Sequence, residues 1–306
     1  MSPSAPDHTS KSQSFDTSCP IIPLAVATNS SNALSSRKVI KINFRMRVER
    51  VEFCNTSGEL IIGDLHYPEP DEGNDVGSRS RRAIILCHGL AANRNGSFLP
   101  ELANFLSLRG YHVLRFDFRG SGESPGVWSY ANYDGEVADI LTAAKFLERT
   151  FSVPLYGLIG HSKAATEVLL YASKYPVSKV ISVSGRFDMS VNPAGRFSEE
   201  QAAALKATGV CEWQGLQVTQ AALDERAALD VEKIVRECTR NSLGKALLIH
   251  AQDDKIIPFG ESIKMHEIGR DSGNMEISIL KSGGHGFRGS RARGELMDVI
   301  WRFLAE

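Results

Sequence analysis

The sequence predicts an α/β protein in which a mostly parallel sheet is covered by helices on both faces. Short apolar runs alternate along the chain with longer stretches whose apolar residues recur with the period of an amphipathic helix. The runs are continuously apolar, as expected for strands that are buried on both faces of a parallel sheet. The sequence before them predicts a hairpin of two strands with alternating apolar residues, so the sheet should begin with an antiparallel pair.

The hairpin is the first predicted element. β-Branched and aromatic residues alternate through Val39–Phe44 and Val48–Phe53. A turn at Asn55–Gly58 follows, and Glu59–His66 returns as the second strand. The next stretch, Glu69–Arg82, carries Pro, Gly, Ser and charges of both signs without an apolar face, so we expect a solvated loop.

The alternating strands and helices follow in order. The predicted strands are Ala83–Cys87, Tyr111–Phe116, Leu155–Ile159, Lys179–Val183, Lys245–His250 and Met275–Leu280. The predicted helices are Phe98–Leu108, Tyr133–Phe151, Lys163–Lys174, Glu261–Ile268 and Glu295–Leu304. Ligands of such sheets bind beyond the carboxyl ends of the strands, so the candidate site should lie directly after the apolar runs.

One insertion interrupts the alternation. About 60 residues separate Val183 from Lys245, whereas an ordinary connection has roughly 2–6. Ser198 and Gln201 have the spacing of a capping box at the start of a helix. The predicted helices of the insertion are Glu199–Ala207, Ala221–Ala228 and Val231–Cys238. We interpret residues 187–243 as a helical cap over the sheet, with a purely structural excursion as the alternative.

Apolar cap residues have two possible roles, as walls of a binding site or as the core of the cap. The candidates are Phe187, Phe197, Leu205, Trp213 and Leu216.

Charge and composition exclude several functions. The chain has 306 residues with a formal net charge of −1, so no overall field favours nucleic acid or an anionic membrane surface. No segment approaches the roughly 20 apolar residues of a membrane span, and the histidines form no metal-binding motif. We therefore expect no nucleic-acid partner, no integral membrane segment and no metal. The oligomeric state stays open.

The N-terminal segment and the cysteines bear on localisation. Residues 1–38 are rich in Ser and Thr and poor in acidic groups, which predicts a disordered tail or, alternatively, a transit peptide for a plastid or mitochondrion. Residues 39–306 should form the folded domain. The five cysteines are scattered without a CxxC pair, which predicts free thiols in a reducing, intracellular compartment, with the cytoplasm favoured.

The strongest local motif is Gly160-His161-Ser162-Lys163-Ala164, which follows an apolar strand and opens a helix. A nucleophile elbow has this context, because a tight turn that exposes the serine hydroxyl needs small residues two positions before and after the serine. Gly160 meets the first requirement, and Ala164 stands where glycine is usual. The alternative is that Ser162 only caps the helix.

A serine nucleophile needs a base and a group that orients the base, and in this strand arrangement they follow in the order acid, then histidine. His285 lies in a Gly-rich loop after the last strand, which predicts the general base. Asp254, in the loop after the preceding strand, is the predicted acid. Asp253 beside it and Asp188 after an earlier strand are the alternatives.

Two backbone amides are predicted to stabilise the oxyanion of the tetrahedral intermediate. One is the amide of Lys163, directly after the nucleophile, and the other is that of Leu90, in the loop after the first core strand. Gly89 would allow close approach, and His88 should brace this loop. The Lys163 side chain forms either a partly buried ion pair or a contact with an anionic substrate group.

Together these motifs resemble the α/β-hydrolase superfamily over about residues 48–305. The matching segments are His88-Gly89, Arg115–Ser124, Gly160–Lys163, Ser184–Asp188, Asp254–Pro258 and Gly284-His285. Within the superfamily, the sequence is most similar to the esterase/lipase-like group labelled serine aminopeptidase S33, which includes cinnamoyl and feruloyl esterases. Ala164 departs from the usual elbow.

This resemblance implies hydrolysis of a small-molecule carboxylic ester without a cofactor, with Ser162, Asp254 and His285 as the triad. Two alternatives stay open. A thioesterase, peptidase or acyltransferase would use the same triad, and a ligand receptor would keep the pocket without turnover.

Overall fold

The computed structural model describes residues 45–69, 81–192, 195–240 and 244–306. The predicted strand Val39–Phe44, the N-terminal segment and most of the predicted loop Glu69–Arg82 lie outside the described residues. Among the described cysteines, Cys87, Cys211 and Cys238 are free. Cys54 is held in a disulfide, so the prediction that every cysteine is a free thiol is wrong.

Within the described residues, eight strands form one sheet in the order β1-β2-β4-β3-β5-β6-β9-β10. The strands are β1 (Arg45–Cys54), β2 (Leu60–Glu69), β3 (Ala83–Cys87), β4 (His112–Phe116), β5 (Leu155–His161), β6 (Lys179–Val183), β9 (Lys245–Ala251) and β10 (Met275–Leu280). β1 pairs antiparallel with β2, and β2 antiparallel with β4. The remaining neighbours are parallel, as predicted.

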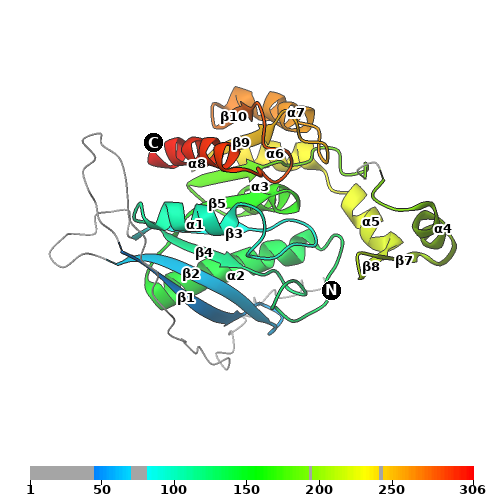
Figure 1. Cartoon of the computed structure of the whole chain (residues 1–306), viewed down its shortest axis with the longest axis horizontal. Coiled ribbons are helices and arrows are strands. Elements are labelled where there is room, and N and C mark those ends of the chain that lie inside the picture. The colour runs from blue at the N-terminus through cyan, green and yellow to red at the C-terminus, as the bar shows by residue number, and fades with distance from the viewer. Residues whose placement is uncertain (1–44, 70–80, 193–194, 241–243) are drawn as a thin grey trace, which may run out of the picture.

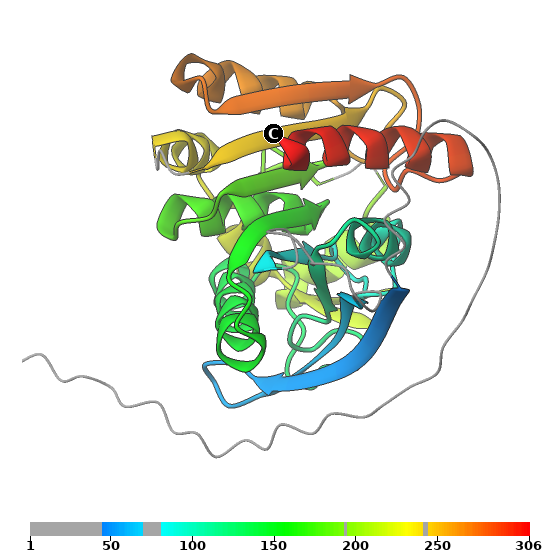
Figure 2. The same cartoon turned by 90° about the vertical axis from the view of Figure 1, so that its left-hand side faces the viewer.

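Helices cover both faces of the sheet (Figure 2). One face carries α1 (Leu99–Ser107) and α8 (Ser290–Ala305). The other carries α2 (Tyr133–Phe151), α3 (Lys163–Lys174), α6 (Val231–Arg240) and α7 (Gly260–Gly269), which is followed by the short 3₁₀ helix η2 (Arg270–Ser272). Buried apolar side chains fill the space between each helical layer and the sheet. The two-faced burial accounts for the continuous apolar runs of the central strands.

The insertion between β6 and β9 contains α4 (Glu199–Thr208), β7 (Val210–Trp213), β8 (Leu216–Thr219) and α5 (Gln220–Ala227) before α6. The capping box of Ser198 and Gln201 forms as predicted. β7 and β8 form an antiparallel hairpin that the sequence analysis did not predict. Figure 1 shows α4, β7, β8 and α5 together at one end of the molecule, whereas α6 packs against α3 in the helical layer.

Candidate active site

Ser162 lies at the sharp turn between β5 and α3. Its backbone has φ 60° and ψ −111°, a conformation that residues with a side chain rarely adopt. The Ser162 amide donates a hydrogen bond of 2.9 Å to the carbonyl oxygen of Val183 at the end of β6. The neighbouring strand therefore holds the strained residue, and its side chain lies at the carboxyl edge of the sheet.

The turn closes so tightly that residue 160 must lack a side chain. A Cβ added to Gly160 would lie 2.1 Å from the carbonyl oxygen of Ala164. The Ala164 side chain is fully buried in the apolar core, so the methyl group at this unusual elbow position is accommodated. The strand-to-turn-to-helix geometry is that of a nucleophile elbow.

We expect Gly160→Ala to lower the free energy of unfolding by ~3 kcal/mol or more, because the added methyl group must displace the backbone at Ala164. Ester hydrolysis should fall with it, since Ser162 would move. Gly157→Ala, on the same strand, is the matched control: its Cβ would have ordinary contacts of 3.5 Å and longer. Urea unfolding of both variants measures the difference, and equal stability would contradict the close contact.

Ser162, His285 and Asp254 form a continuous chain of hydrogen bonds. The distance from His285 Nε2 to Ser162 Oγ is 2.8 Å, and that from His285 Nδ1 to Asp254 Oδ2 is also 2.8 Å. If Nδ1 carries the proton and donates to the carboxylate, Nε2 is free to accept the hydroxyl proton of the serine. The structure thus brings together the three residues that the sequence analysis selected.

Asp254 is buried and accepts hydrogen bonds on both oxygens. Oδ1 accepts from the amides of Ile256 and Ile257, at 2.8 and 3.0 Å, and Oδ2 accepts from His250 as well as His285. Burial alone would raise the pKa of this carboxyl, but the hydrogen bonds from His250 and His285 outweigh it and hold the pKa below its usual range. Asp254 is therefore ionised at neutral pH.

The two alternative acids have other partners. Asp253 Oδ1 accepts the amide of Gly284 at 2.8 Å, which fixes the loop before His285. Asp188 Oδ1 accepts from the amide and hydroxyl of Ser190. Among the three candidate carboxylates, Asp254 is the one in contact with the His285 ring.

Three further residues hold the histidine and the acid in place, and the sequence analysis did not identify these roles. The carbonyl oxygen of His285 accepts hydrogen bonds from His161 Nε2 at 2.7 Å and from the Ser184 hydroxyl at 3.2 Å. Burial, and then the neighbouring His285, lowers the pKa of His161 to about 4, so its ring is neutral. His250 contacts Asp254 through Nε2 at 3.1 Å. The position of His161 between Gly160 and Ser162 was the signal available in the sequence.

The loop that follows β3 lies directly against the serine. A Cβ added to Gly89 would lie 2.9 Å from the Cβ of Ser162, and Leu90 and Lys163 line the same pocket as Ser162. His88 contacts the carbonyl oxygen of Gly89 through Nδ1 at 2.9 Å and accepts the amide of Phe118 through Nε2 at 3.1 Å. His88 therefore braces this loop.

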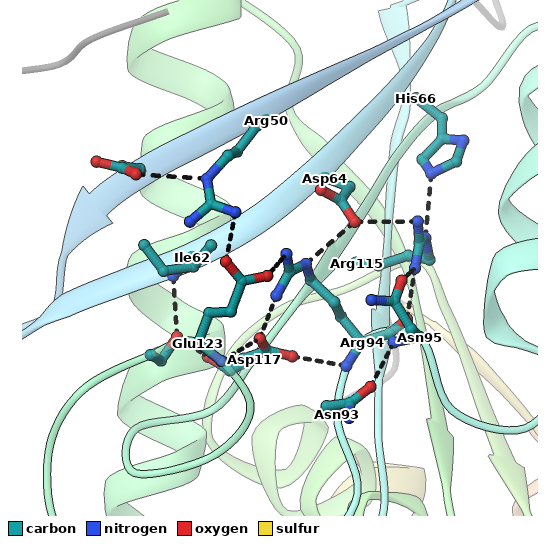
Figure 3. A network of polar contacts seen from close by, with 12 residues as sticks. Arg50, Ile62, Asp64, His66, Asn93, Arg94, Asn95, Arg115, Asp117 and Glu123 are labelled. Atoms are coloured by element: carbon teal, nitrogen blue, oxygen red, sulfur yellow. Dashed lines mark hydrogen bonds and ion pairs between the residues drawn. The ribbon is translucent and has the colours of Figure 1, made fainter. Parts of the chain in front are cut away.

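A mostly buried ionic network, with Glu123 exposed, anchors the same loop to the sheet (Figure 3). Arg94 forms ion pairs with Asp64, Asp117 and Glu123, and its amide donates to Asp117 at 2.6 Å. Arg115 donates to Asp64 at 3.1 Å and to the carbonyl oxygen of Arg94 at 2.5 Å. Because these partners lie on β2, on β4 and in the turn after β4, the network fixes the loop that carries Leu90.

The side chain of Lys163 is buried in an ion pair, which settles the choice left open by the sequence. Its Nζ lies 2.5 Å from Glu136 and 3.5 Å from Glu167. Burial alone would lower the pKa of Lys163, but both carboxyls raise it above its ordinary value. Burial, and then the neighbouring Glu136, raises the pKa of Glu167. This ammonium is already neutralised within the protein.

Lys163→Met should lower the free energy of unfolding by about 3–5 kcal/mol, because it leaves Glu136 buried without its cation. Hydrolysis of a neutral and of an anionic ester should fall by the same factor. Lys174→Met, on the same helix, removes an exposed pair with Asp134 and should cost about 0–1 kcal/mol. Chemical denaturation measures both, and a loss confined to the anionic ester would restore a recognition role for Lys163.

A pocket of about 450 Å³, including its open mouth, lies over Ser162. Its walls include Tyr130 and Tyr133, Met189, Ile256 and three arginines, Arg186, Arg196 and Arg226. None of the five apolar cap residues proposed as walls lines it. Four of them, Phe187, Phe197, Leu205 and Trp213, pack into the core. For these four residues the structure agrees with the second of the two roles considered, the core of the cap.

The described residues contain neither a candidate metal site nor a helix that could span a membrane. No group of three or more His, Cys, Asp and Glu side chains in the described ranges is placed to hold a metal ion. In the same part of the chain, every helix is too short or too polar to cross a membrane.

Comparison with known proteins agrees with this architecture. The sequence profile of the alpha/beta hydrolase fold matches residues 82–209. The uncharacterised protein YqkD of Bacillus subtilis is 28% identical over 225 residues, which cover 72% of this chain and 70% of that protein. The lysophosphatidylserine lipase ABHD12 of Danio rerio is 28% identical over 63% of this chain. The match covers 48% of the lipase, so the chain spans about half its length.

Solved structures share the same fold. The esterase Pf2001 of Pyrococcus furiosus superposes with a TM-score of 0.64 at 19% identity, covering 90% of this chain and 97% of that one. Est1E of Butyrivibrio proteoclasticus, solved with bound ferulic acid, has a TM-score of 0.65 at 16% identity, covering 81% and 97%. The chain has the α/β-hydrolase fold, as predicted, and it resembles esterases and lipases within that fold. These likenesses support hydrolase chemistry.

Proposed function

We propose that this protein is a serine hydrolase that cleaves a carboxylic ester of a small molecule through an acyl-enzyme intermediate. The observation that supports this most is the continuous series of hydrogen bonds from Ser162 Oγ through the His285 ring to the buried Asp254 carboxylate, with Ser162 lining a pocket. The likeness to esterases and a lipase agrees with it.

In the first half-reaction, Ser162 Oγ attacks the ester carbonyl carbon while His285 Nε2 takes the hydroxyl proton. Asp254 stabilises the imidazolium that forms. The amides of Leu90 and Lys163 are the donors that we assign to the oxyanion. Collapse of the intermediate breaks the bond to the alcohol, which leaves with the proton from His285.

In the second half-reaction, His285 removes a proton from water, which attacks the acyl group on Ser162. The acid is released as the proton returns to the serine. A thioesterase, peptidase or acyltransferase would share the first half-reaction, since it differs in the leaving group or in the acceptor.

Pre-steady-state hydrolysis of 4-nitrophenyl acetate tests the proposal. An acyl-enzyme that forms faster than it hydrolyses releases a burst of about one 4-nitrophenol per active site. If acylation is the slower step, hydroxylamine should divert the acyl group from acetate to acetohydroxamate without changing the rate of enzymatic 4-nitrophenol release. If the folded protein shows neither turnover nor acylation, the proposed enzyme activity is contradicted and a ligand receptor is favoured.

A further inference from the structure

Three arginines from separate segments of the chain converge on the pocket over Ser162. Arg186 follows β6, Arg196 precedes α4 and Arg226 lies on α5. Arg186 and Arg226 are both 6% exposed, and Arg196 is half-buried. Side chains that are far apart in sequence thus place positive charge in the wall of one pocket.

The described residues supply no carboxylate partner for these three guanidinium groups. Arg186 donates to the carbonyl oxygen of Ile256 at 3.1 Å. Arg226 donates to the carbonyl oxygens of Met189 and of Val191. Arg196 lies over the ring of Trp213, 4.9 Å from its centroid. Every one of these contacts is with a neutral group.

Nearby carboxylates make their hydrogen bonds elsewhere, and Asp188, whose charge interacts with that of Arg186, accepts from Ser190. Glu261 accepts hydrogen bonds from the amides of Phe187 and Asp188, at 3.1 and 2.8 Å. Glu136 and Glu167 lie against Lys163. Burial, and then the neighbouring Arg226, lowers the pKa of Arg186, and the charge of Glu261 offsets part of this effect.

Buried charges in proteins are normally paired, because an unpaired charge has lost its hydration without gaining a counter-ion. Other buried arginines follow that rule, as Arg94 pairs with Asp117 and Arg115 with Asp64. A guanidinium carries five N–H donors in a planar fork that matches carboxylate and phosphate. Arg186 uses one and Arg226 two of its donors in the contacts above. Donors remain for a ligand.

We propose that the pocket selects esters that carry an anionic group, a carboxylate or a phosphate, and that Arg186, Arg196 and Arg226 bind this group while Ser162 attacks the ester carbonyl. The inference rests on the proposed function and adds a substrate class to it. It also assigns the recognition of negative charge to arginines of the 186–226 segment and not to Lys163.

Two pairs of substrates test the preference at constant ionic strength, since salt screens such contacts. Mono(4-nitrophenyl) adipate is compared with its methyl ester for an anionic acyl part, and 4-acetoxybenzoate with its methyl ester for an anionic alcohol part. We expect kcat/KM to be about tenfold higher for the anionic member of at least one pair. A preference for the neutral member in both pairs, or equal values in both, would overturn the inference.

Arg196→Gln is the primary variant, because Arg196 is half-buried and its contact is with a ring, so the fold should survive. It should lower kcat/KM for the anionic ester by a larger factor than for the neutral ester and so remove most of the preference. Arg196→Lys should restore part of the preference. Arg236→Gln, an exposed arginine on α6 outside the pocket, removes the same charge and should change neither value. If both glutamine variants lower the preference equally, the preference arises from the long-range field of the protein, and specific binding by Arg196 is contradicted.

A binding measurement separates this inference from the proposed catalysis. Calorimetry of the full chain carrying Ser162→Ala, titrated with adipate and with inorganic phosphate, needs no turnover. Binding that weakens when Arg196→Gln is added supports the anion site even if the protein hydrolyses no ester. The tighter anion identifies the group as carboxylate or phosphate. If the wild type hydrolyses esters but shows no charge preference, and the Ser162→Ala protein binds neither anion, the anion site is contradicted while the proposed function stands.

Discussion

Ser162→Ala is expected to lower kcat for a neutral 4-nitrophenyl ester by about 10⁴- to 10⁶-fold, the largest effect of any single substitution. Ser162 supplies the atom that forms the acyl bond, and its Oγ is the one that lies 2.8 Å from His285 Nε2. The variant should fold as well as the wild type, because alanine removes only the hydroxyl from a position whose backbone is held by Val183.

Steady-state rates and a thermal melt of the same preparation measure this prediction. Ser173→Ala is a matched control, because its hydroxyl donates to Leu170 within α3 and does not line the pocket. Its kcat should stay within about twofold of the wild type. If Ser162→Ala retains a tenth or more of the wild-type rate, the nucleophile is another residue.

Asp254→Asn is expected to lower kcat by about 10⁴-fold while leaving the pocket intact. The amide removes the negative charge that stabilises the His285 imidazolium, and its NH₂ group favours the wrong tautomer of the ring. Asp253→Asn provides the comparison, since Asp253 contacts the amide of Gly284 and not the ring. Asp253→Asn should lower kcat by less than about tenfold. Equal losses in the two variants would mean that the acid has been assigned to the wrong carboxylate.

The same carboxylate should make stability depend on pH. The pKa of Asp254 is lower in the folded protein than its unfolded value of about 3.9, so the folded state gains stability from this group above that pH. The gain is lost as the pH falls below it towards the folded pKa. Asp254→Asn should therefore lose less stability than the wild type between about pH 5 and pH 2 in chemical denaturation. Parallel pH profiles would contradict this contribution.

The sequence predicted the layered sheet because each central strand is a short apolar run buried on both faces. Bounds of α2, α3 and β6 agree with the prediction, since their patterns begin and end abruptly. The β7–β8 hairpin was missed because its turn is Gln214-Gly215, with both residues at positive φ. Such turns normally carry Asn-Gly or Asp-Gly, so Gln-Gly gave no signal.

The three reacting side chains could be selected because each follows a strand in a fixed order along the chain. The residues that hold the site in place could not be predicted in this way. Glu136 is distant in sequence from Lys163, and Ser184 from His285, so only the packed sheet shows that they meet. The pocket wall stayed open for the same reason, because the sequence could not show that the fold turns Arg226 inward from a largely polar helix.

Reaction of the full chain with a fluorophosphonate probe tests the central claim most directly. Such probes phosphonylate only serines that are activated by a base. After digestion, mass spectrometry should place the adduct on Ser162 in the wild type, with slower labelling in His285→Ala and none in Ser162→Ala. An adduct on another serine that persists in Ser162→Ala, or no adduct on the folded wild type, would contradict the activated nucleophile on which this account depends.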